Sequence, residues 1–384
     1  MRVLYILHAS GMGGATISFL KMTEGLKQKG YDIFIILPSK DKLFEKEVGH
    51  IANKVFVLPL VNSIYPKAES IISIIVFYFL LFPRIIVMTH RRRKSMKALR
   101  TLINEIRPDI IHTNTGIVHV GYLCAKEKKI PHVWHLREYQ DYDFNWYIMP
   151  SKRFYEKQLE KSYVVSITKD ILNHFDLVES QKHRVIYNGI FRKDETALLY
   201  PKERYFLCAS RVSPSKGIKD VIITFSKVHP FLPDYKLKIL GFGEEQYIKE
   251  MKILCEQLKC RESVIFEGYH NNVRPFMEKA IALIVASNCE GFGRMTAEAA
   301  FCGCLVIGRN KGGTKEILEE TGGLLFDDNE ELGRCMINVA EMNDHNYLDL
   351  VKKAQKRAVE LYSVEKNVEV IDQFYKYIIS NERK

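Results

Sequence analysis

The chain has 384 residues, which is enough for two domains that each bury a core of their own. Hydrophobic residues make up 47% and charged residues 27% of the sequence, a balance typical of a soluble globular protein. The net charge of +11 favours a negatively charged partner, such as a phosphorylated substrate, an anionic membrane face or a nucleic acid. The eight cysteines form neither a CxxC pair nor a regular framework, which excludes a disulfide scaffold and predicts a reducing, cytoplasmic location without structural zinc.

Short β-rich runs alternate with helical patterns through the first half of the chain. The first run leads directly into a glycine-rich loop without a small-residue cleavage site, so we expect no signal peptide. An amphipathic helix is predicted over residues 16–29, ending at Gly30. Strands are predicted at residues 3–7, 33–37, 54–58, 109–112, 132–135, 163–167 and 184–187.

The loop between the first strand and the first helix contains Gly11, Gly13 and Gly14. Because these residues have no side chains, the backbone amides of the loop can approach a phosphate closely. The spacing is Gly-x-Gly-Gly, not the Gly-x-Gly-x-x-Gly of dinucleotide-binding folds, and the second strand ends at Leu37 without an acidic residue. Both departures disfavour an enzyme with a nicotinamide cofactor.

One segment breaks the alternation of strands and helices. Residues 71–82 are almost wholly apolar, Pro83 follows, and a basic run occupies residues 90–94. A transmembrane helix needs roughly 20 uninterrupted apolar residues, and this run is shorter. Two interpretations stay open: a buried or domain-capping helix, or an element that docks on an anionic membrane through the neighbouring cations.

In the second half of the chain, strands and helices alternate again. This half follows a polar and charged stretch at residues 191–204, which is the predicted boundary between the domains. The alternation implies two α/β domains built on parallel sheets. Ligands of open α/β sheets bind at the carboxyl ends of the strands, so we expect the site between the domains. Strands are predicted at residues 205–209, 236–240, 263–267, 282–286, 304–308 and 323–326.

The most informative motif is Glu290-Gly-Phe-Gly-Arg-Met-Thr-Ala-Glu298, after a predicted buried strand. Glu290 would lie at the strand's edge and Glu298 on the next helix. Eight residues of helix advance roughly 800°, within about 80° of whole turns, so both carboxylates can face one cleft. The amides of Phe292 and Gly293 would lie at a helix N-terminus, which favours an anion. The motif suits a ligand with hydroxyls and phosphate; the alternative is a strand–helix corner with two solvated glutamates.

Two cations precede this motif in the same half of the chain. Arg211 ends a predicted strand, and Lys216 opens the next helix beside Gly217. A fork-shaped donor and a point cation a few residues apart can hold a diphosphate. Ordinary solvated charges are the alternative.

In their combination and order, these motifs resemble those of the retaining glycosyltransferases of family 4, and the resemblance covers nearly the whole chain. Residues 111–115 and 134–138 further resemble the branch that builds bacterial capsular polysaccharides and exopolysaccharides. The segments that carry the family resemblance are residues 11–14, 108–112 (Pro-Asp-Ile-Ile-His), 188–189 (Asn-Gly), 211 with 216–217, 290–298 and 312–316 (Gly-Gly-Thr-Lys-Glu).

The resemblance implies an α/β protein with the GT-B fold, in which two Rossmann-like parallel-sheet domains enclose a cleft. The acceptor domain would span residues 1–190 and the nucleotide-sugar donor domain residues 191–363. The amphipathic C-terminal pattern, residues 364–384, would be a helix that crosses back to the first domain.

The resemblance also implies roles for the motif residues. Glu290 contacts the transferred sugar, the amides of Phe292 and Gly293 reach this sugar or its phosphate, and Glu298 holds the ribose hydroxyls. Arg211 and Lys216 stabilise the departing nucleoside diphosphate, so neither a metal nor another cofactor is expected. His270 stands where the family places the nucleobase, with an ordinary strand-end turn as the alternative. The expected donor-binding set is Gly13, Gly14, Arg211, Lys216, His270, Glu290, Phe292, Gly293 and Glu298.

His112 and His135 each end a predicted strand of the first domain and would point into the cleft. Such a histidine could donate to a sugar hydroxyl or steady an oxocarbenium-like transition state; a satisfied structural histidine is the alternative. Glu138 could hold or deprotonate an acceptor hydroxyl, so Glu138 and His112 are the acceptor-side candidates. Glu290 is a binding carboxylate rather than a nucleophile, because the resemblance implies front-face transfer assisted by the donor phosphate. The expected catalytic set is Glu290, His135, Lys216 and Arg211.

The expected function is therefore retaining transfer of a hexose-type sugar from a nucleotide diphosphate sugar to a growing lipid-linked surface polysaccharide. A UDP-linked sugar is expected because such donors are frequent in the family. The expected location is the cytoplasm, with peripheral contact at the inner face of the cell membrane. Alternatives are a nucleotide-sugar epimerase or hydrolase of the same fold and a non-catalytic binding protein. Nucleic acid is not an expected partner, because neither a stacking-aromatic platform nor a known motif accompanies the positive charge.

Overall fold

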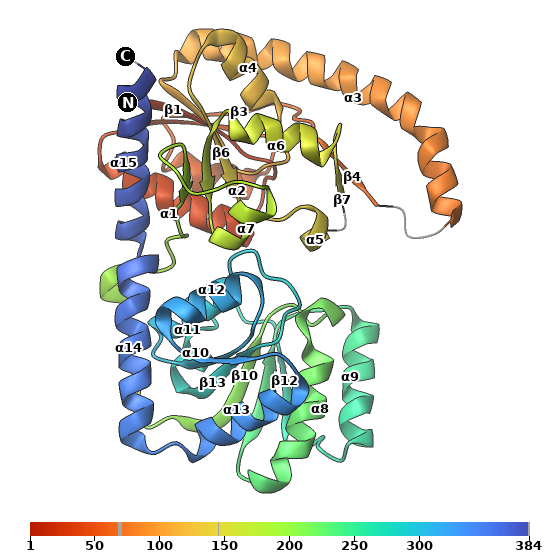
Figure 1. Cartoon of the computed structure of the whole chain (residues 1–384), viewed down its shortest axis with the longest axis vertical. Helices are drawn as coiled ribbons and strands as arrows, with labels where there is room; N and C mark the ends of the chain where they lie inside the picture. The colour runs from red at the N-terminus through yellow and green to blue at the C-terminus, as the bar shows by residue number, and fades with distance from the viewer. Residues whose placement is uncertain (68–70, 145, 383–384) are drawn as a thin grey trace. The chain divides into compact units, whose positions relative to one another are not determined.

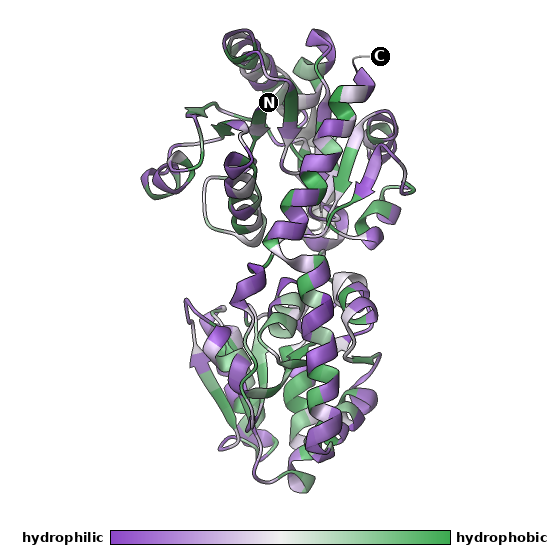
Figure 2. Ribbon diagram, turned by 90° about the vertical axis from the view of Figure 1, so that its left-hand side faces the viewer, coloured by the Kyte–Doolittle hydropathy of each residue, from purple (hydrophilic) through white to green (hydrophobic). Residues whose placement is uncertain are grey.

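The computed structural model describes residues 1–67, 71–144 and 146–382 of the chain (Figure 1). The described residues form two compact units: residues 1–189 with 364–384, and residues 190–363. Each unit is an α/β layer structure around a parallel sheet, so the predicted fold class is confirmed. In both units hydrophobic strands lie between helices whose outer faces are hydrophilic (Figure 2).

The first unit contains a seven-stranded parallel sheet in the order β3-β2-β1-β5-β6-β8-β9. The fully buried strands read as continuous apolar runs because helices cover both faces. The strands are β1 (Arg2–Ile6), β2 (Asp32–Leu37), β3 (Lys54–Val57), β5 (Ile110–Thr113), β6 (His132–Leu136), β8 (Tyr163–Ser166) and β9 (His183–Val185). The helices are α1 (Gly14–Gln28), α2 (Lys42–Gly49), α3 (Ile71–Ile106), α4 (Val120–Lys128), α5 (Asp141–Phe144), α6 (Lys152–Glu160), α7 (Lys169–His174) and α15 (Val364–Glu382).

Alternate residues of β1 serve the two cores of this unit. Val3 and Tyr5 pack with α1, α2 and the C-terminal helix α15, whereas Leu4 and Ile6 pack with α3 and α4. The C-terminal helix is held closely, because a Cβ at Gly25 of α1 would lie 2.4 Å from Val368 of α15. The inner face of α15 is therefore part of the first unit's core.

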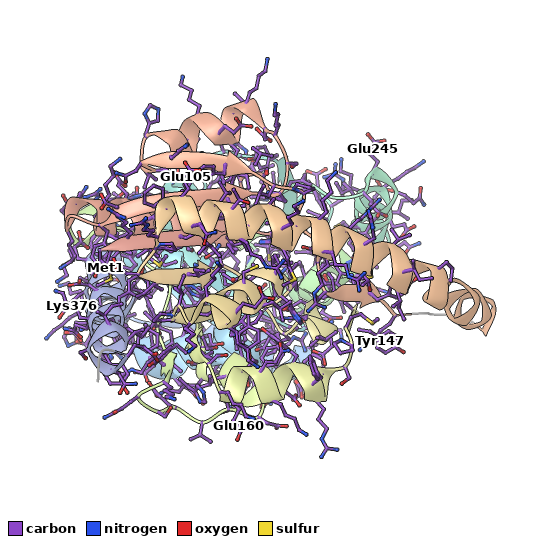
Figure 3. The ribbon with its side chains drawn as sticks, turned by 90° about the horizontal axis from the view of Figure 1, so that it is seen from above. Met1, Glu105, Tyr147, Glu160, Glu245 and Lys376 are labelled. Carbon is purple, nitrogen blue, oxygen red and sulfur yellow. The ribbon has the colours of Figure 1, made fainter. Side chains whose placement is uncertain are left out.

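The sequence did not predict a small antiparallel pair, β4 (Ile64–Pro66) with β7 (Trp146–Ile148). It also gave no indication that α3 continues through Pro83 as one helix. Figure 3 shows α3 lying across the strands of the first unit, with its first turns projecting beyond them. One interpretation of the sequence expected residues 71–82 to be buried. The side chains of these residues are outside the described part of the structure, so this expectation stays a prediction. No helix in the described parts of the chain combines the length and apolar character of a membrane span.

The second unit contains a six-stranded parallel sheet in the order β12-β11-β10-β13-β14-β15. Its strands are β10 (Glu203–Ala209), β11 (Lys236–Leu240), β12 (Val264–Gly268), β13 (Ala280–Val285), β14 (Leu305–Arg309) and β15 (Leu324–Phe326). Its helices are α8 (Ile218–Val228), α9 (Glu245–Gln257), α10 (Arg274–Lys279), α11 (Arg294–Phe301), α12 (Gly312–Thr321), α13 (Asn329–Glu341) and α14 (Asp344–Tyr362), with the 3-10 turns η1 (Lys193–Glu195), η2 (Pro214–Lys216) and η3 (His229–Phe231).

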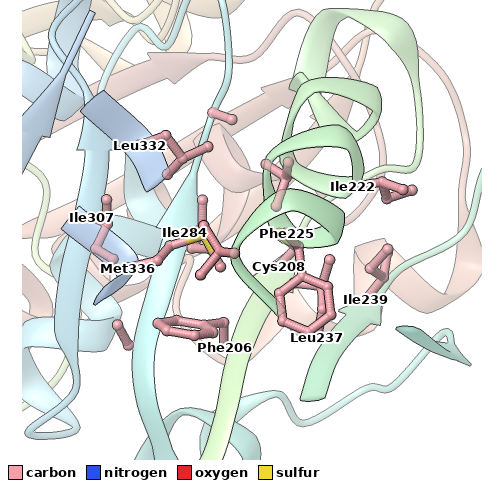
Figure 4. Close-up of a cluster of buried hydrophobic side chains, with 14 of the residues drawn as sticks. Phe206, Cys208, Ile222, Phe225, Leu237, Ile239, Ile284, Ile307, Leu332 and Met336 are labelled. Carbon is pink, nitrogen blue, oxygen red and sulfur yellow. The ribbon is translucent and has the colours of Figure 1, made fainter. Parts of the chain in front are cut away.

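Two cores again lie on either side of this sheet. On one face, Phe206 and Cys208 of β10 pack with Phe225 of α8 and Met336 of α13 (Figure 4). On the other face, Leu207 of β10 packs with residues of α10, α11 and α12. These cores fix the carboxyl ends of β10 and β13, where the loops that carry the motif residues begin.

Candidate functional site

A pocket of about 200 Å³ lies in the second unit at the carboxyl ends of β10 and β13. The loops that follow these strands and the first turn of α11 supply its polar walls. This is the position where an open parallel sheet binds ligands. The pocket is lined by Ala209, Ser210, Arg211, Lys216, Ile218, Ile284, Val285, Ala286, Ser287, Glu290, Gly293, Arg294, Met295 and Thr296.

Lys216 and Glu290 meet in this pocket. The Lys216 Nζ lies 2.6 Å from Oε1 of Glu290, and both side chains are about a quarter exposed. Gly217 makes this approach possible: its φ is +68°, and a Cβ there would lie 2.3 Å from the carbonyl oxygen of Ala286. The turn therefore holds the lysine against the end of β13.

Arg211 also lines the pocket, and its guanidinium carbon lies 5.8 Å from the ring centroid of Phe242. Its side chain is exposed, so the guanidinium is open to an incoming anion. Arg211, Lys216 and Glu290 are thus three predicted site residues that the fold brings to one place. A diphosphate could bridge the two cations, and a carboxylate beside them suits sugar hydroxyls.

The Gly-Phe-Gly turn is held by α12. The N–H of Gly313 donates to the carbonyl oxygen of Glu290 over 2.8 Å, and a Cβ at Gly313 would lie 2.3 Å from the carbonyl oxygen of Phe292. Gly293 has a φ of +80° and precedes the first residue of α11. This tight packing fixes the amide groups at the start of α11 along the pocket, where the helix dipole favours an anion.

Glu298 is ion-paired on its own helix and is not among the residues that line the pocket. Its Oε1 lies 2.5 Å from Nε of Arg294, one turn earlier, and the Nη1 of Arg294 is buried without a hydrogen-bond partner among the described residues. Sequence reasoning missed Arg294. The i,i+4 spacing of Arg294 and Glu298 was the available signal.

His270 lies apart from these residues, in the turn after β12. Its ring packs at 4.7 Å, centroid to centroid, on the ring of Phe276 in α10, and it does not line the pocket. The expected base-binding role of His270 stays a prediction.

In the first unit, two of the three glycines of the predicted phosphate loop begin α1. Gly13 is the N-cap residue and Gly14 the first helical residue. A Cβ at Gly11 or Gly13 would meet no atom within 4 Å, so no contact within the protein requires a glycine there. The open space at these positions is compatible with the close approach of a ligand, and the phosphate-binding role stays a prediction.

His112 and His135 lie next to each other and are buried. The Nε2 of His112 is 3.0 Å from Nδ1 of His135, and the Nδ1 of His112 is 2.5 Å from the hydroxyl oxygen of Tyr375. Burial, followed by the charge of Arg137, lowers the pKa of both histidines well below 6.5. Both ring nitrogens of His112 therefore have hydrogen-bond partners inside the first unit, namely Tyr375 and His135.

Arg137 is buried directly after β6 and is fixed by two amide side chains. Its Nε donates to Asn114 over 3.0 Å, and its Nη1 donates to Asn188 over 2.7 Å. Burial lowers its pKa to about 9, which still leaves the guanidinium charged at neutral pH. Asn114 and Asn188 follow β5 and β9, so three strand ends converge on this cation.

Two more ionisable groups lie near Arg137. Burial, with a contribution from Arg137, lowers the pKa of His8 to about 4. Sequence reasoning missed His8, although its position after the first strand was a signal. Burial, with a contribution from Asp143, raises the pKa of Glu138 to about 7, and Oε1 of Glu138 has no hydrogen-bond partner among the described residues. Glu138 thus changes charge near neutral pH, as an acid–base group would.

The described residues contain no group of three or more His, Cys, Asp and Glu side chains arranged to hold a metal ion. The expectation of a metal-independent reaction stays a prediction.

Two Rossmann-like units, the second with a cationic pocket at its strand ends, define the GT-B fold class. The model of the Glycosyltransferase Family 4 domain matches residues 12–192, and the model described as Glycosyl transferases group 1 matches residues 190–357. Because the two matches together run from residue 12 to residue 357, the chain belongs to the family 4 glycosyltransferases.

Over the residues that align, curated relatives are between 22% and 28% identical to this chain. The alpha-monoglucosyldiacylglycerol synthase of Acholeplasma laidlawii is 22% identical over 372 residues, which cover 86% of this chain and 85% of the relative. The poly(glycerol-phosphate) alpha-glucosyltransferase of Bacillus subtilis is 26% identical over 220 residues, 55% of this chain; the match spans only 32% of that longer relative.

Solved structures share the fold. Anabaena HepE in complex with UDP has a TM-score of 0.78 and 18% identity, with 98% of this chain and all of that chain covered. The lipopolysaccharide outer core galactosyltransferase WaaB has a TM-score of 0.67 and 17% identity, with 99% and 100% covered.

Proposed function

We propose that this chain is a retaining glycosyltransferase that moves a hexose from a UDP-sugar to a lipid-linked saccharide of a surface polysaccharide. The observation that carries the proposal is the strand-end pocket in which Lys216, Arg211 and Glu290 meet. A nucleotide sugar offers the anions and hydroxyls that these three side chains recognise.

In the proposed reaction, the diphosphate of the donor displaces Glu290 as the partner of Lys216. Arg211 and Lys216 then stabilise the negative charge that grows on the departing diphosphate, with no step that requires a metal. The released carboxylate of Glu290 accepts hydrogen bonds from hydroxyls of the transferred sugar. The amides at the start of α11 add donors that are fixed before the reaction begins.

The bond changes follow from transfer on one face of the sugar. The bond between the anomeric carbon and the diphosphate oxygen breaks, and the acceptor oxygen bonds to the same face of that carbon. The acceptor proton passes to the departing phosphate oxygen, so configuration is retained and UDP leaves as the second product. Glu290 acts here by binding and not as a nucleophile.

Similar proteins support the donor and the stereochemistry. HepE has been crystallised with UDP, with UDP and glucose, and with UDP-glucose. The names of several relatives specify alpha-linked products, including the alpha-glucosyltransferase of Bacillus subtilis. These names favour a UDP-hexose and retention in this chain.

The lipid-linked acceptor is supported by α3 and by relatives. Ile85, Ile86 and Val87 of α3 are 40%, 54% and 49% exposed, and the cations of residues 91–94 follow one to two turns later. Such a helix fits peripheral docking on the anionic inner face of the cell membrane. A Campylobacter jejuni relative, 28% identical over 169 residues (42% of this chain and 45% of that protein), is named as a transferase acting on a diphospho-undecaprenol-linked saccharide.

Thermal-shift measurements against UDP-, GDP- and ADP-sugars, followed by product analysis with the best donor, test the proposal. We expect a UDP-hexose to raise the melting temperature most and to give an α-linked product with a saccharide acceptor. Incubation without an acceptor should give only slow hydrolysis. Rapid hydrolysis or an epimerised sugar would identify the alternative enzyme classes, and no stabilisation by any nucleotide sugar would contradict the donor site.

A further inference from the structure

A chain of buried hydrogen bonds joins the C-terminal helix to His135. Tyr5 of β1 and His112 of β5 are partners in the parallel register, and His112 is the partner of Val133 in β6. Tyr5, His112 and Val133 therefore share one face of the sheet, and His135 lies on that face two residues further along β6. Tyr375 of α15 packs on the same face, in the core that contains Tyr5 and Val133.

The distances show that this series of hydrogen bonds is continuous. The hydroxyl oxygens of Tyr5 and Tyr375 are 3.1 Å apart, and the hydroxyl of Tyr375 lies 2.5 Å from Nδ1 of His112. The Nε2 of His112 lies 3.0 Å from Nδ1 of His135. All four side chains are at most 1% exposed. The four side chains therefore bond directly to one another and are shielded from solvent.

Arg137 determines which ring nitrogen of His135, and in turn of His112, carries the proton. Its Nη2 lies 3.4 Å from Nδ1 of His135, and a guanidinium can only donate. The Nδ1 of His135 must therefore be the acceptor, for Arg137 and also for Nε2–H of His112. In neutral His112 the other nitrogen, Nδ1, is then bare and accepts from the hydroxyl of Tyr375. Burial and the charge of Arg137 keep the pKa of both histidines well below 6.5, which keeps both rings neutral.

The proton of His135 is left on Nε2. That nitrogen is buried and has no hydrogen-bond partner among the described residues. A buried N–H donor without a partner is destabilising, and a hydrogen bond to a ligand oxygen would remove that cost. The reverse proton arrangement would place a bare Nε2 there and set an N–H of His135 against the N–H of Arg137.

We propose that Tyr375 is a positioning residue for glycosyl transfer. Its hydroxyl donates to His112 and so fixes the tautomer in which His135 offers Nε2–H to an oxygen of the bound substrate. The role rests on the proposed transferase function, because it needs a substrate oxygen at His135. The proton arrangement itself is a property of the ligand-free chain and is tested separately.

Nitrogen-15 spectra of histidine-labelled, ligand-free protein test the tautomers, with His112→Asn and His135→Asn used for assignment. We expect His112 and His135 each to carry the proton on Nε2, with Nδ1 bare. Tyr375→Phe removes the donor while keeping the ring and should shift both histidines towards a mixture of tautomers. Tyr5→Phe should leave them unchanged, because in this arrangement Tyr5 only donates to Tyr375. A proton on Nδ1 of His135 in the wild type would overturn the proposal even if Tyr375→Phe did not fold.

The second measurement is catalysis, with Tyr377→Phe as a matched control. Tyr377 lies on the same helix, and its hydroxyl donates to Gln181 over 3.1 Å, away from the histidines. We expect Tyr375→Phe to lower kcat/KM by roughly 10- to 100-fold, the loss seen when a partner that orients a metal-bound histidine is removed. Tyr377→Phe should retain wild-type kcat/KM.

The outcomes separate the two proposals. An active wild type with Tyr375→Phe as active as Tyr377→Phe would overturn the positioning role. A wild type that neither transfers nor hydrolyses any UDP-sugar would overturn the proposed function and with it the positioning role, whereas the spectra would still decide the proton arrangement.

Discussion

The Nζ of Lys216 and Oε1 of Glu290 are 2.6 Å apart in the strand-end pocket, although the residues are separated by 74 positions in the chain. The pair places a positive and a negative group at the end of β13 without a ligand. Because each group has an internal partner, neither charge is left uncompensated before the donor binds. A nucleotide sugar can then exchange one ion pair for two interactions, diphosphate with Lys216 and hydroxyls with Glu290.

Lys216→Ala should remove a cation that stabilises the departing diphosphate. We expect kcat to fall by roughly 10²–10³-fold, as on the loss of one preorganised donor to a developing charge. Steady-state kinetics with a UDP-hexose measure the effect. Lys219→Ala is the control, because Lys219 is exposed on α8 and does not line the pocket. Equal kcat values in the two variants would remove Lys216 from the catalytic set.

Glu298→Gln should weaken binding of the nucleoside diphosphate by roughly 10- to 100-fold, since charged hydrogen bonds contribute about 1.5–3 kcal/mol. The change breaks the ion pair with Arg294 and removes the carboxylate expected to hold the ribose. Calorimetric titration with UDP measures the affinity. Glu278→Gln is closely matched, because it breaks the i,i+4 pair between Glu278 and Arg274, 2.6 Å long, outside the pocket. Weakening by both variants alike would point to a general loss of stability.

Glu138→Gln should change the dependence of stability on pH. The pKa of Glu138 is raised from 4.5 to about 7 by burial, so the folded chain binds more protons than the unfolded chain between these values. Stability due to this group is complete below about pH 4.5, decreases as pH rises, and is lost above about pH 7. The decrease totals about 3 kcal/mol, at 1.4 kcal/mol for each pH unit.

Denaturant unfolding at pH 5 and pH 8 measures this change. The wild type should lose more stability than Glu138→Gln between the two values, and the exposed Glu160→Gln should behave as the wild type does. If Glu138, instead of the departing phosphate oxygen, takes the acceptor proton, transfer by the wild type rises with pH through about 7, and Glu138→Gln loses that rise. Identical unfolding profiles would contradict the raised pKa.

Gly313→Ala should distort the Gly-Phe-Gly turn. The new Cβ would lie 2.3 Å from the carbonyl oxygen of Phe292, and this backbone atom cannot rotate away. We expect a loss of about 1–3 kcal/mol in the free energy of unfolding, typical of overpacking, together with weaker donor binding. Gly333→Ala on α13 is the control, because its Cβ would meet only side-chain atoms at 3.4 Å or more. A stable Gly313→Ala with normal UDP affinity would show that the turn tolerates displacement.

The sheets and the Lys216–Glu290 site were accessible from the sequence because their signals are local. Apolar runs predict the strands, and strand ends in an open α/β sheet converge at one edge. Helical geometry also allowed Glu290 and Glu298 to face one cleft. However, only Glu290 of the two lines the pocket, and the carboxylate of Glu298 is paired with Arg294 one turn earlier.

The partners of the buried histidines were not predictable from local patterns. Tyr375 bonds to His112 across 263 positions, and Asn188 bonds to Arg137 across 51. Such pairs depend on how strands and the C-terminal helix pack, and no spacing rule encodes them. The continuation of α3 through Pro83 as one helix was likewise not indicated by the sequence pattern.

Replacing Arg91, Arg93 and Lys94 of α3 together with glutamine should weaken binding to anionic vesicles. All three residues are exposed, and each cation near an anionic surface contributes about 1 kcal/mol, so we expect roughly 100-fold weaker binding. Flotation with phosphatidylglycerol vesicles measures the bound fraction, and neutral phosphatidylcholine vesicles should bind weakly throughout. Arg153, Lys157 and Lys161, exposed on or just after α6, give a control variant with the same loss of charge. Equal weakening in both variants would indicate net charge, whereas a wild type that stays in solution yet glycosylates a soluble acceptor would contradict membrane docking.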